Sequence, residues 1–157
     1  MSALLEIQGL NKAYGKVQAL TGVDLEIGRQ CIFGLVGPNG AGKTTLFSII
    51  SGSTKADSGS IRFDGEPLSF VKLPSTGALT ILPQDAHFAA RVSVGRQLTY
   101  FGRLIGLSST QASSEARRVL QLVGLSDVYS RYPNTLSHGM LKRVGIAQAF
   151  LGDPKLI

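Results

Sequence analysis

The chain has 157 residues, 43% of them hydrophobic and 17% charged, which is typical of one globular domain and excludes a disordered or disulfide-built protein. The formal net charge of +6 could attract nucleic acid, but the basic residues are spread singly apart from Arg117-Arg118 and Lys142-Arg143, so we expect no nucleic-acid partner. We find no basic leader and no apolar run long enough to cross a bilayer, and therefore expect a cytoplasmic protein.

Apolar patterning predicts two kinds of strand in the first half of the chain. Residues alternate between apolar and polar over 23–27 and again over 61–64, which indicates half-buried, antiparallel strands. The runs "CIFGLV" (31–36) and "ALTIL" (78–82) are continuously apolar, as expected of strands covered on both faces in a parallel sheet. Cys31 lies in the first of these runs, so we expect its thiol to be buried and inert.

Residues 37–45, "GPNGAGKTT", match the phosphate-binding pattern GxxxxGK[ST] between an apolar run and a helical segment. Glycines let backbone N–H groups turn towards phosphate oxygens, and the N-terminus of the following helix adds a positive dipole end. Lys43 would place its charge between the β- and γ-phosphates, and Thr44 would ligate Mg²⁺. The loop alone leaves kinases, GTPases and motor ATPases open.

Apolar residues at helical spacing predict three amphipathic helices in the second half of the chain, with Gly124 placed to end the second one. The three stripes are Val94, Leu98, Phe101 and Ile105; Ala116, Val119, Leu120 and Val123; and Met140, Val144, Ala147 and Leu151. The order of elements therefore predicts an α/β fold with a helical subdomain.

Further motifs narrow the class of nucleotide-binding protein. Gln84 follows the second apolar run in "ILPQD", residues 136–139 read Leu-Ser-His-Gly at the start of the third helix, and Tyr14 stands in "KAYGKVQAL". With the phosphate loop, these motifs come in the order found in the ATP-binding cassette family, the ATPase subunits of ABC transporters, which the chain resembles from Leu4 to its last residue.

The resemblance implies a P-loop NTPase core with an N-terminal antiparallel β part and a helical subdomain. Residues 1–157 would be one ABC ATPase domain without its C-terminal part. Within it, residues 1–84 would form the β-rich part with the phosphate and Gln loops, 85–135 the helical subdomain, and 136–157 the signature and the helix after it. The segment "LTYFGRLIGLS" resembles exporter cassettes more than importer ones.

The resemblance also implies ATP and Mg²⁺ as cofactors and a role for each motif. Tyr14 would stack on adenine, Gln84 would bind Mg²⁺ or the attacking water, and Lys43 would act with Gln84 in catalysis. The implied nucleotide-binding residues are Tyr14, Gly37, Asn39, Gly40, Gly42, Lys43, Thr44, Thr45, Ser137 and Gly139. The implied metal ligands are Thr44 and Gln84.

Two cassettes of this family pack head to tail, so that Ser137 and Gly139 would serve the nucleotide of a second subunit. Transmembrane permease subunits would hold the dimer at the cytoplasmic face of the membrane and couple ATP hydrolysis to transport. His138 and Met140 depart from the family signature, which has Gly and Gln there, so closure of the dimer could be weaker or asymmetric. Alternatively, His138 could donate to the γ-phosphate.

The resemblance stops at "DPKLI", where a family member would continue into the acidic Walker B segment. That segment supplies the carboxylates that order Mg²⁺ and orient the attacking water. We therefore expect a fragment of a longer cassette that is nearly inactive alone. The alternative is a nucleotide-binding module without hydrolytic activity.

Overall fold

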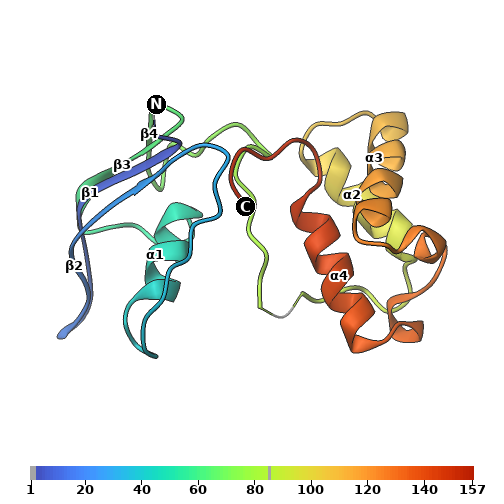
Figure 1. Ribbon diagram of the computed structural model, residues 1–157, viewed down its shortest axis with the longest axis horizontal. Coiled ribbons are helices and arrows are strands. Elements are labelled where there is room, and N and C mark those ends of the chain that lie inside the picture. The colour runs from blue at the N-terminus through green and yellow to red at the C-terminus, as the bar shows by residue number, and fades with distance from the viewer. Residues whose placement is uncertain (1–2, 85) are drawn as a thin grey trace. The chain divides into compact units, whose positions relative to one another are not determined.

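The computed structural model describes residues 3–84 and 86–157. The chain divides into two compact units, one ending at Pro74 and the other beginning at Ser75. Among the described residues, the first unit holds the strands and helix α1, and the second holds helices α2, α3 and α4 (Figure 1). The subdivision at residue 84 that the resemblance implies stays a prediction.

The first unit is built on a four-stranded sheet in the order β2-β1-β3-β4, with every neighbouring pair antiparallel. The strands are β1 (Leu5–Tyr14), β2 (Val17–Ile27), β3 (Ser58–Phe63) and β4 (Glu66–Leu68). Residues 23, 25 and 27 of β2 are half-buried and alternate with exposed carboxylates, while Ile61 and Phe63 of β3 are buried. The antiparallel strands expected from alternation are thus confirmed.

Side chains stabilise an irregular register between β1 and β2. The register shifts after Ile7 and again on both sides of Lys12. Gly9 has a φ of +55° and its N–H donates to Oδ1 of Asp24 at 2.7 Å. Gly22 has a φ of +58° and its N–H donates to Oδ1 of Asn11 at 2.8 Å. The side chains of Asp24 and Asn11 therefore accept the two backbone N–H groups that the shifted register leaves without a partner in the other strand.

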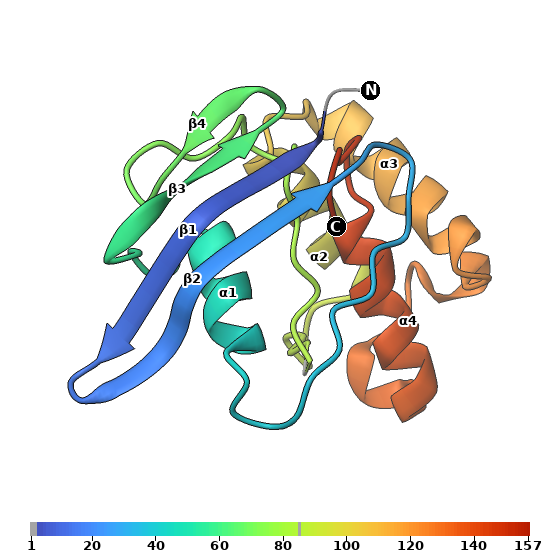
Figure 2. The same cartoon turned by 60° about the vertical axis from the view of Figure 1, so that its left-hand side comes forward.

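Helix α1 (Lys43–Ile50) lies against one face of this sheet and contacts β2 (Figure 2). Its buried side chains are Leu46, Ile49 and Ile50, at the three- and four-residue spacing that puts them on one face. The sheet contributes Leu5, Ile7 and Leu10, each at most 2% exposed. Burial of this apolar surface fixes the start of α1, and with it the end of the phosphate loop.

Three helices make up the core of the second unit: α2 (Val94–Leu104), α3 (Ser109–Leu122) and α4 (His138–Ala149). Two short 3₁₀ turns, η1 (Ser126–Val128) and η2 (Pro133–Thr135), connect α3 to α4. The buried residues come from the predicted stripes and from the connecting turns: Val94, Leu98, Ala116, Val119, Leu120, Leu125, Val128, Leu136, Val144, Ala147 and Leu151. The other residues of the stripes, Phe101, Ile105, Val123 and Met140, are partly buried against them. The three predicted helices are confirmed.

Local signals set the ends of α3, and a close approach fixes α2 against the chain before α4. Ser108 and Gln111 form a capping box, and Gly124 has the φ of +68° that ends the helix. Gly95 lies against Tyr129, because a Cβ at this position would stand 2.5 Å from the tyrosine ring. Glycine is therefore required here by packing rather than by backbone conformation.

The expectation that residues 31–36 form a buried strand is wrong. The segment is not a strand, Ile32 is 103% exposed and Val36 is 94% exposed. Cys31 is also exposed, so the expected buried thiol is wrong too, and its Sγ–H donates to the carbonyl of Gly28 at 3.3 Å. The physical reason is that an apolar run becomes a buried strand only beside a neighbouring strand, and no described residue pairs with this segment.

Residues 78–82 are likewise not a strand, although they begin to pair in the expected direction. Leu79 forms a parallel bridge with Leu156, in which the N–H of Thr80 donates to the carbonyl of Leu156 at 3.0 Å. Ile81 and Leu82 are 45% and 43% exposed, so the run is not covered on both faces. The predicted parallel pairing is therefore present only as a single bridge.

None of the helices in the described parts of the chain combines the length and the apolar character needed to cross a bilayer.

Candidate phosphate-binding loop and associated motifs

Lys43 begins helix α1 and reaches back across the loop that precedes it. Its Nζ donates to the carbonyl of Gly37 at 2.6 Å and to that of Pro38 at 2.8 Å. The ammonium group therefore stands inside the loop, where two backbone carbonyls accept hydrogen bonds from it. This position leaves its third N–H available to an anion.

Two glycines shape the loop next to Lys43. Gly40 and Gly42 both have a φ of +83°, in the left-handed region that favours glycine. Gly42 is also confined by β2, because a Cβ there would stand 2.3 Å from the carbonyl oxygen of Ala19 and 2.7 Å from Leu20. The end of the loop is thus fixed against the sheet.

The remaining predicted phosphate contacts lie in the same short segment. Asn39 and Thr44 are exposed, Thr45 is half-buried, and both threonines belong to the first turn of α1. Backbone N–H groups of a helix's first turn have no acceptor within the helix. The loop therefore presents backbone donors, a hydroxyl and the Lys43 ammonium on an accessible surface.

Tyr14 is the last residue of β1, opposite Val17 at the end of the β1–β2 hairpin. Its side chain is 51% exposed. Lys12 Nζ lies 5.4 Å from the centroid of its ring, within the range of a cation–π contact. The position before the second strand agrees with the one expected from the sequence.

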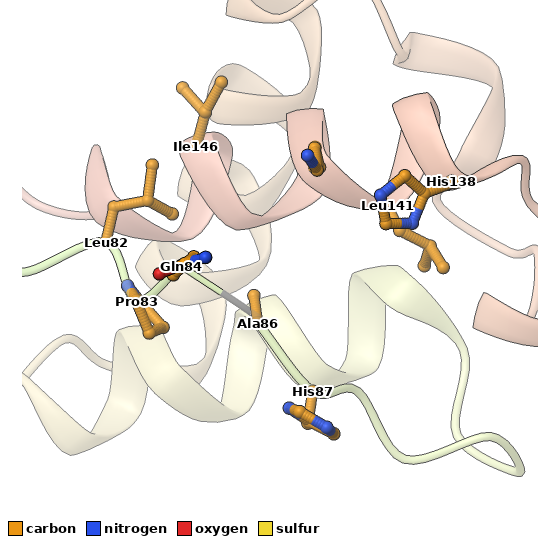
Figure 3. A pocket seen from close by; sticks show the side chains of 9 residues that line it. Leu82, Pro83, Gln84, Ala86, His87, His138, Leu141 and Ile146 are labelled. Atoms are coloured by element: carbon orange, nitrogen blue, oxygen red, sulfur yellow. The ribbon is translucent and has the colours of Figure 1, made fainter.

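Gln84 is exposed and lines a cavity of about 500 Å³ within the second unit. The walls are formed by residues 82–84 and 86–87 and by α4 (Figure 3). His138, at the start of α4, is part of the same lining. The structure therefore brings together the Gln motif and the Leu-Ser-His-Gly motif, which lie far apart in the sequence. His87 also lines this cavity, and the sequence motifs did not identify it.

Ser137 is the N-cap of α4, and its Oγ accepts the N–H of Met140 at 3.3 Å. The hydroxyl hydrogen remains available as a donor. Gly139 is helical and has open space where a Cβ would stand. Glycine inside a helix is less stable than alanine by about 1 kcal/mol. Packing within the described chain does not require glycine at this position, because nothing lies within 4 Å of a Cβ there.

Sequence motifs did not identify Lys12 and Asp57 as part of this region. Asp57 Oδ1 accepts Lys12 Nζ at 2.8 Å, and its Oδ2 accepts the N–H of Ala13 at 2.7 Å. The lysine, and next the backbone N–H, hold the pKa of Asp57 below its ordinary value. No local pattern could have joined Lys12 to Asp57, which are separated by 45 positions.

The sequence profile described as ABC transporter matches residues 20–157. The chain belongs to this family. The profile covers the phosphate loop, Gln84 and the residues around Ser137, so the motifs and the family match agree.

Curated relatives in the ABC family include importers and exporters. The chain is 32% identical to the linearmycin resistance ATP-binding protein LnrL of Bacillus subtilis, over 98% of this chain and 50% of that protein. It is 34% identical to a Nod factor export ATP-binding protein I of Cupriavidus metallidurans, over 100% of this chain and 52% of that protein. It is 36% identical to the sulfate/thiosulfate import ATP-binding protein CysA of Bacillus cereus, over 98% of this chain and 44% of that protein. The chain thus spans about half the length of these relatives.

Solved ABC ATPase structures share the fold. The cbiO1 protein of Clostridium perfringens, part of an ABC transporter complex, matches with a TM-score of 0.85 and 29% identity over 99% of this chain and 64% of that one. The ADP conformation of another ATP-binding cassette of an ABC transporter matches with a TM-score of 0.85 and 26% identity over 99% of this chain and 68% of that one. These matches confirm the P-loop NTPase fold of the ABC family and its nucleotide-binding character.

Proposed function

We propose that this chain binds ATP through residues 37–45 and forms the nucleotide-binding part of an ABC transporter ATPase. The observation that carries the proposal is the position of Lys43, whose ammonium group stands within a glycine-shaped loop at the start of α1. The family match supports the same assignment. Hydrolysis of ATP by the complete protein would drive transport.

The residues present fit a bound nucleoside triphosphate. Gly40 and Gly42 bend the loop so that its N–H groups and the first turn of α1 can face phosphate oxygens. Gly37, Asn39 and Thr45 complete this loop, and Thr44 offers a hydroxyl to Mg²⁺. When bound, Mg²⁺ neutralises charge on the phosphates.

Gln84 is proposed to bind Mg²⁺ or orient the attacking water, acting with Lys43 in catalysis. Gln84 is exposed, which leaves its amide accessible to a ligand. Tyr14, half-exposed at the end of the hairpin, is proposed to stack on the adenine ring. Base stacking on an aromatic side chain contributes about 1–3 kcal/mol in other nucleotide complexes.

Ser137 and Gly139 are proposed to contact the γ-phosphate held by a second cassette, packed head to tail. Two observations support action on another subunit: Gly139 has open space on the described chain, and Ser137 keeps a hydroxyl hydrogen to donate. His138 is exposed beside them, so its imidazole would meet the same phosphate. A ring N–H of His138 would donate to that anion.

Permease subunits at the cytoplasmic face of a membrane are the proposed partners of this dimer. Relatives named as export, import and lipoprotein-releasing ATP-binding proteins support a transport role in general. An exporter is proposed from the segment 98–108 alone. A nucleotide-binding module without hydrolytic activity remains the second candidate, favoured by the loop geometry, which needs no carboxylate to hold ATP.

Calorimetric titration with ATP tests the site. Lys43→Ala should remove measurable binding because it deletes the ammonium group inside the loop. Lys55→Ala removes the same charge at an exposed position just beyond α1 and is the matched control, expected to bind like the unaltered chain. Unchanged affinity in Lys43→Ala would overturn the assignment of the loop.

Steady-state phosphate release separates the two candidate functions. The assay measures the complete protein in the presence of Mg²⁺. A transport ATPase predicts turnover by the complete protein that Gln84→Ala strongly lowers, whereas ATP binding without turnover by the complete protein would favour the nucleotide-binding module.

A further inference from the structure

Asp57 lies just before β3 and acts where that strand stops pairing with β1. The last pair of the β1–β3 ladder joins Asn11 to Ser58. Beyond it, the Ala13 N–H donates to Oδ2 of Asp57 at 2.7 Å instead of to a strand carbonyl. The Asp57 N–H in turn donates to the carbonyl of Asn11 at 3.0 Å. Asp57 therefore continues the hydrogen bonding of β1 towards Tyr14.

The other oxygen of the same carboxylate holds Lys12. Lys12 Nζ donates to Oδ1 of Asp57 at 2.8 Å, and the lysine side chain is only 14% exposed. The same Nζ lies 5.4 Å from the centroid of the Tyr14 ring. One face of that ring is therefore taken by a cation whose own position is set by an ion pair, which leaves the other face for a ligand.

The β1–β2 hairpin, which carries Lys12 and Tyr14, is joined to the phosphate loop through β2. Lys12 is opposite Leu20 in the register, and Leu20 is one of the residues that confine Gly42. Tyr14 follows Lys12 by two residues, which in an extended strand corresponds to about 7 Å. The tyrosine ring and the end of the phosphate loop are thus attached to one short stretch of hairpin within the same unit.

We propose that Lys12 and Asp57 are positioning residues for the nucleotide base: Asp57 fixes Lys12, and Lys12 fixes the ring of Tyr14 with one face free to stack on adenine. The inference rests on the proposed function, in which Tyr14 stacks on the base. Neither residue touches the nucleotide in this arrangement. Their effect on affinity therefore depends on the presence of a base.

Titration with ATP and with inorganic tripolyphosphate tests this dependence on the base. Lys12→Met should weaken ATP binding about three- to tenfold, since the ring loses the contact that orients it, and leave tripolyphosphate affinity unchanged. Lys16→Met removes a charge from the hairpin turn, where the described structure gives the lysine no ion pair, and serves as the control. Equal weakening for both ligands would show that Lys12 acts as a general charge and would overturn the proposal.

Substitutions of Asp57 and conservative replacement of Lys12 separate positioning from a fold effect. Asp57→Ala should weaken ATP binding as Lys12→Met does, and Asp57→Asn, which keeps an acceptor for the Ala13 N–H, should lie between it and the unaltered chain. Lys12→Arg should restore ATP affinity because a guanidinium can keep both contacts. In NMR spectra, ring protons of Tyr14 should shift on adding ATP, and less so in Lys12→Met.

Two further variants distinguish failure of this inference from failure of the proposed function. If Lys43→Ala retains ATP binding, the phosphate site itself is wrong. If Lys43→Ala loses ATP binding but Tyr14→Ala does not weaken ATP binding, the phosphate site is supported. The stacking role of Tyr14 and this inference are then both overturned. If Tyr14→Ala weakens ATP binding while Lys12→Met and Asp57→Ala bind normally, the stacking role stands and only the positioning inference is overturned.

Discussion

Gly40 and Gly42 offer a matched pair for testing how the phosphate loop is held, because both have a φ of +83° and lie two residues apart. An alanine at either position would be strained in this left-handed conformation. The surroundings differ, however. A Cβ on Gly40 would meet nothing within 4 Å, whereas a Cβ on Gly42 would stand 2.3 Å from the carbonyl oxygen of Ala19.

The two substitutions should therefore lower the free energy of unfolding by different amounts. The left-handed conformation costs a non-glycine residue about 1–2 kcal/mol, partly offset by the reduced freedom of the unfolded chain, so we expect Gly40→Ala to lose about 1 kcal/mol. The contact at Gly42 is with backbone, which cannot turn aside as a side chain can. Overpacking of this kind adds about 1–3 kcal/mol, so Gly42→Ala should lose about 2–4 kcal/mol in total.

Thermal unfolding without nucleotide, followed by circular dichroism, measures this difference independently of any role in ATP binding. For a chain of this size each kcal/mol corresponds to a shift in Tm of about 2–4 °C. Gly42→Ala should therefore unfold several degrees below Gly40→Ala. Equal shifts in the two variants would refute the conclusion that β2 confines the end of the loop.

Three further substitutions test the second unit. Gly95→Ala should destabilise the chain by about 1 kcal/mol in thermal unfolding, because the clash with the Tyr129 ring outweighs the gain in helix propensity; a stabilised variant would contradict that packing. Glu115, whose pKa is lowered chiefly by its hydrogen bond from Arg118, adds stability above its ordinary pKa of 4.5 that is lost as the pH falls through the lower folded value. Urea unfolding of Glu115→Gln should show a loss at pH 7 and a weaker acid dependence than the unaltered chain; an unchanged acid dependence would rule out this contribution. Ser137→Ala should lower stability by about 1 kcal/mol through loss of the α4 cap, yet leave ATP affinity of the isolated chain unchanged in calorimetry; weakened binding would argue against action on a second subunit.

The parts of the fold that were predictable are those whose signals are local. Helices α2, α3 and α4 follow from apolar spacing within each helix, and the end of α3 follows from Gly124. The phosphate loop is a contiguous pattern, so its place before α1 could be found without any long-range information. The functional roles of the loop and of Gln84 stay predictions.

The strands expected at 31–36 and 78–82 show where local information fails. Both runs are apolar, and apolarity indicates a tendency to be covered without specifying the covering element. Residues 31–36 have no pairing partner among the described residues, and 78–82 have one bridge, to Leu156. A strand is a property of two segments, so hydropathy along one of them cannot establish it.

The cluster of Lys12, Tyr14 and Asp57 combines both situations. Tyr14 could be singled out from its neighbours in sequence, but the ion pair beside it depends on the β1–β3 register, which brings Asp57 next to Ala13 across 44 positions. The same register explains why a carboxylate is useful there. The pairing with β3 ends at Ser58, and β1 continues to Tyr14 with no strand of the described residues beside it on that side. The Ala13 N–H needs an acceptor and the Lys12 ammonium needs a counter-ion, and the carboxylate of Asp57 serves both. Asp57 therefore continues the hydrogen bonding of β1 and, as we propose, also holds the lysine that orients the ring of Tyr14.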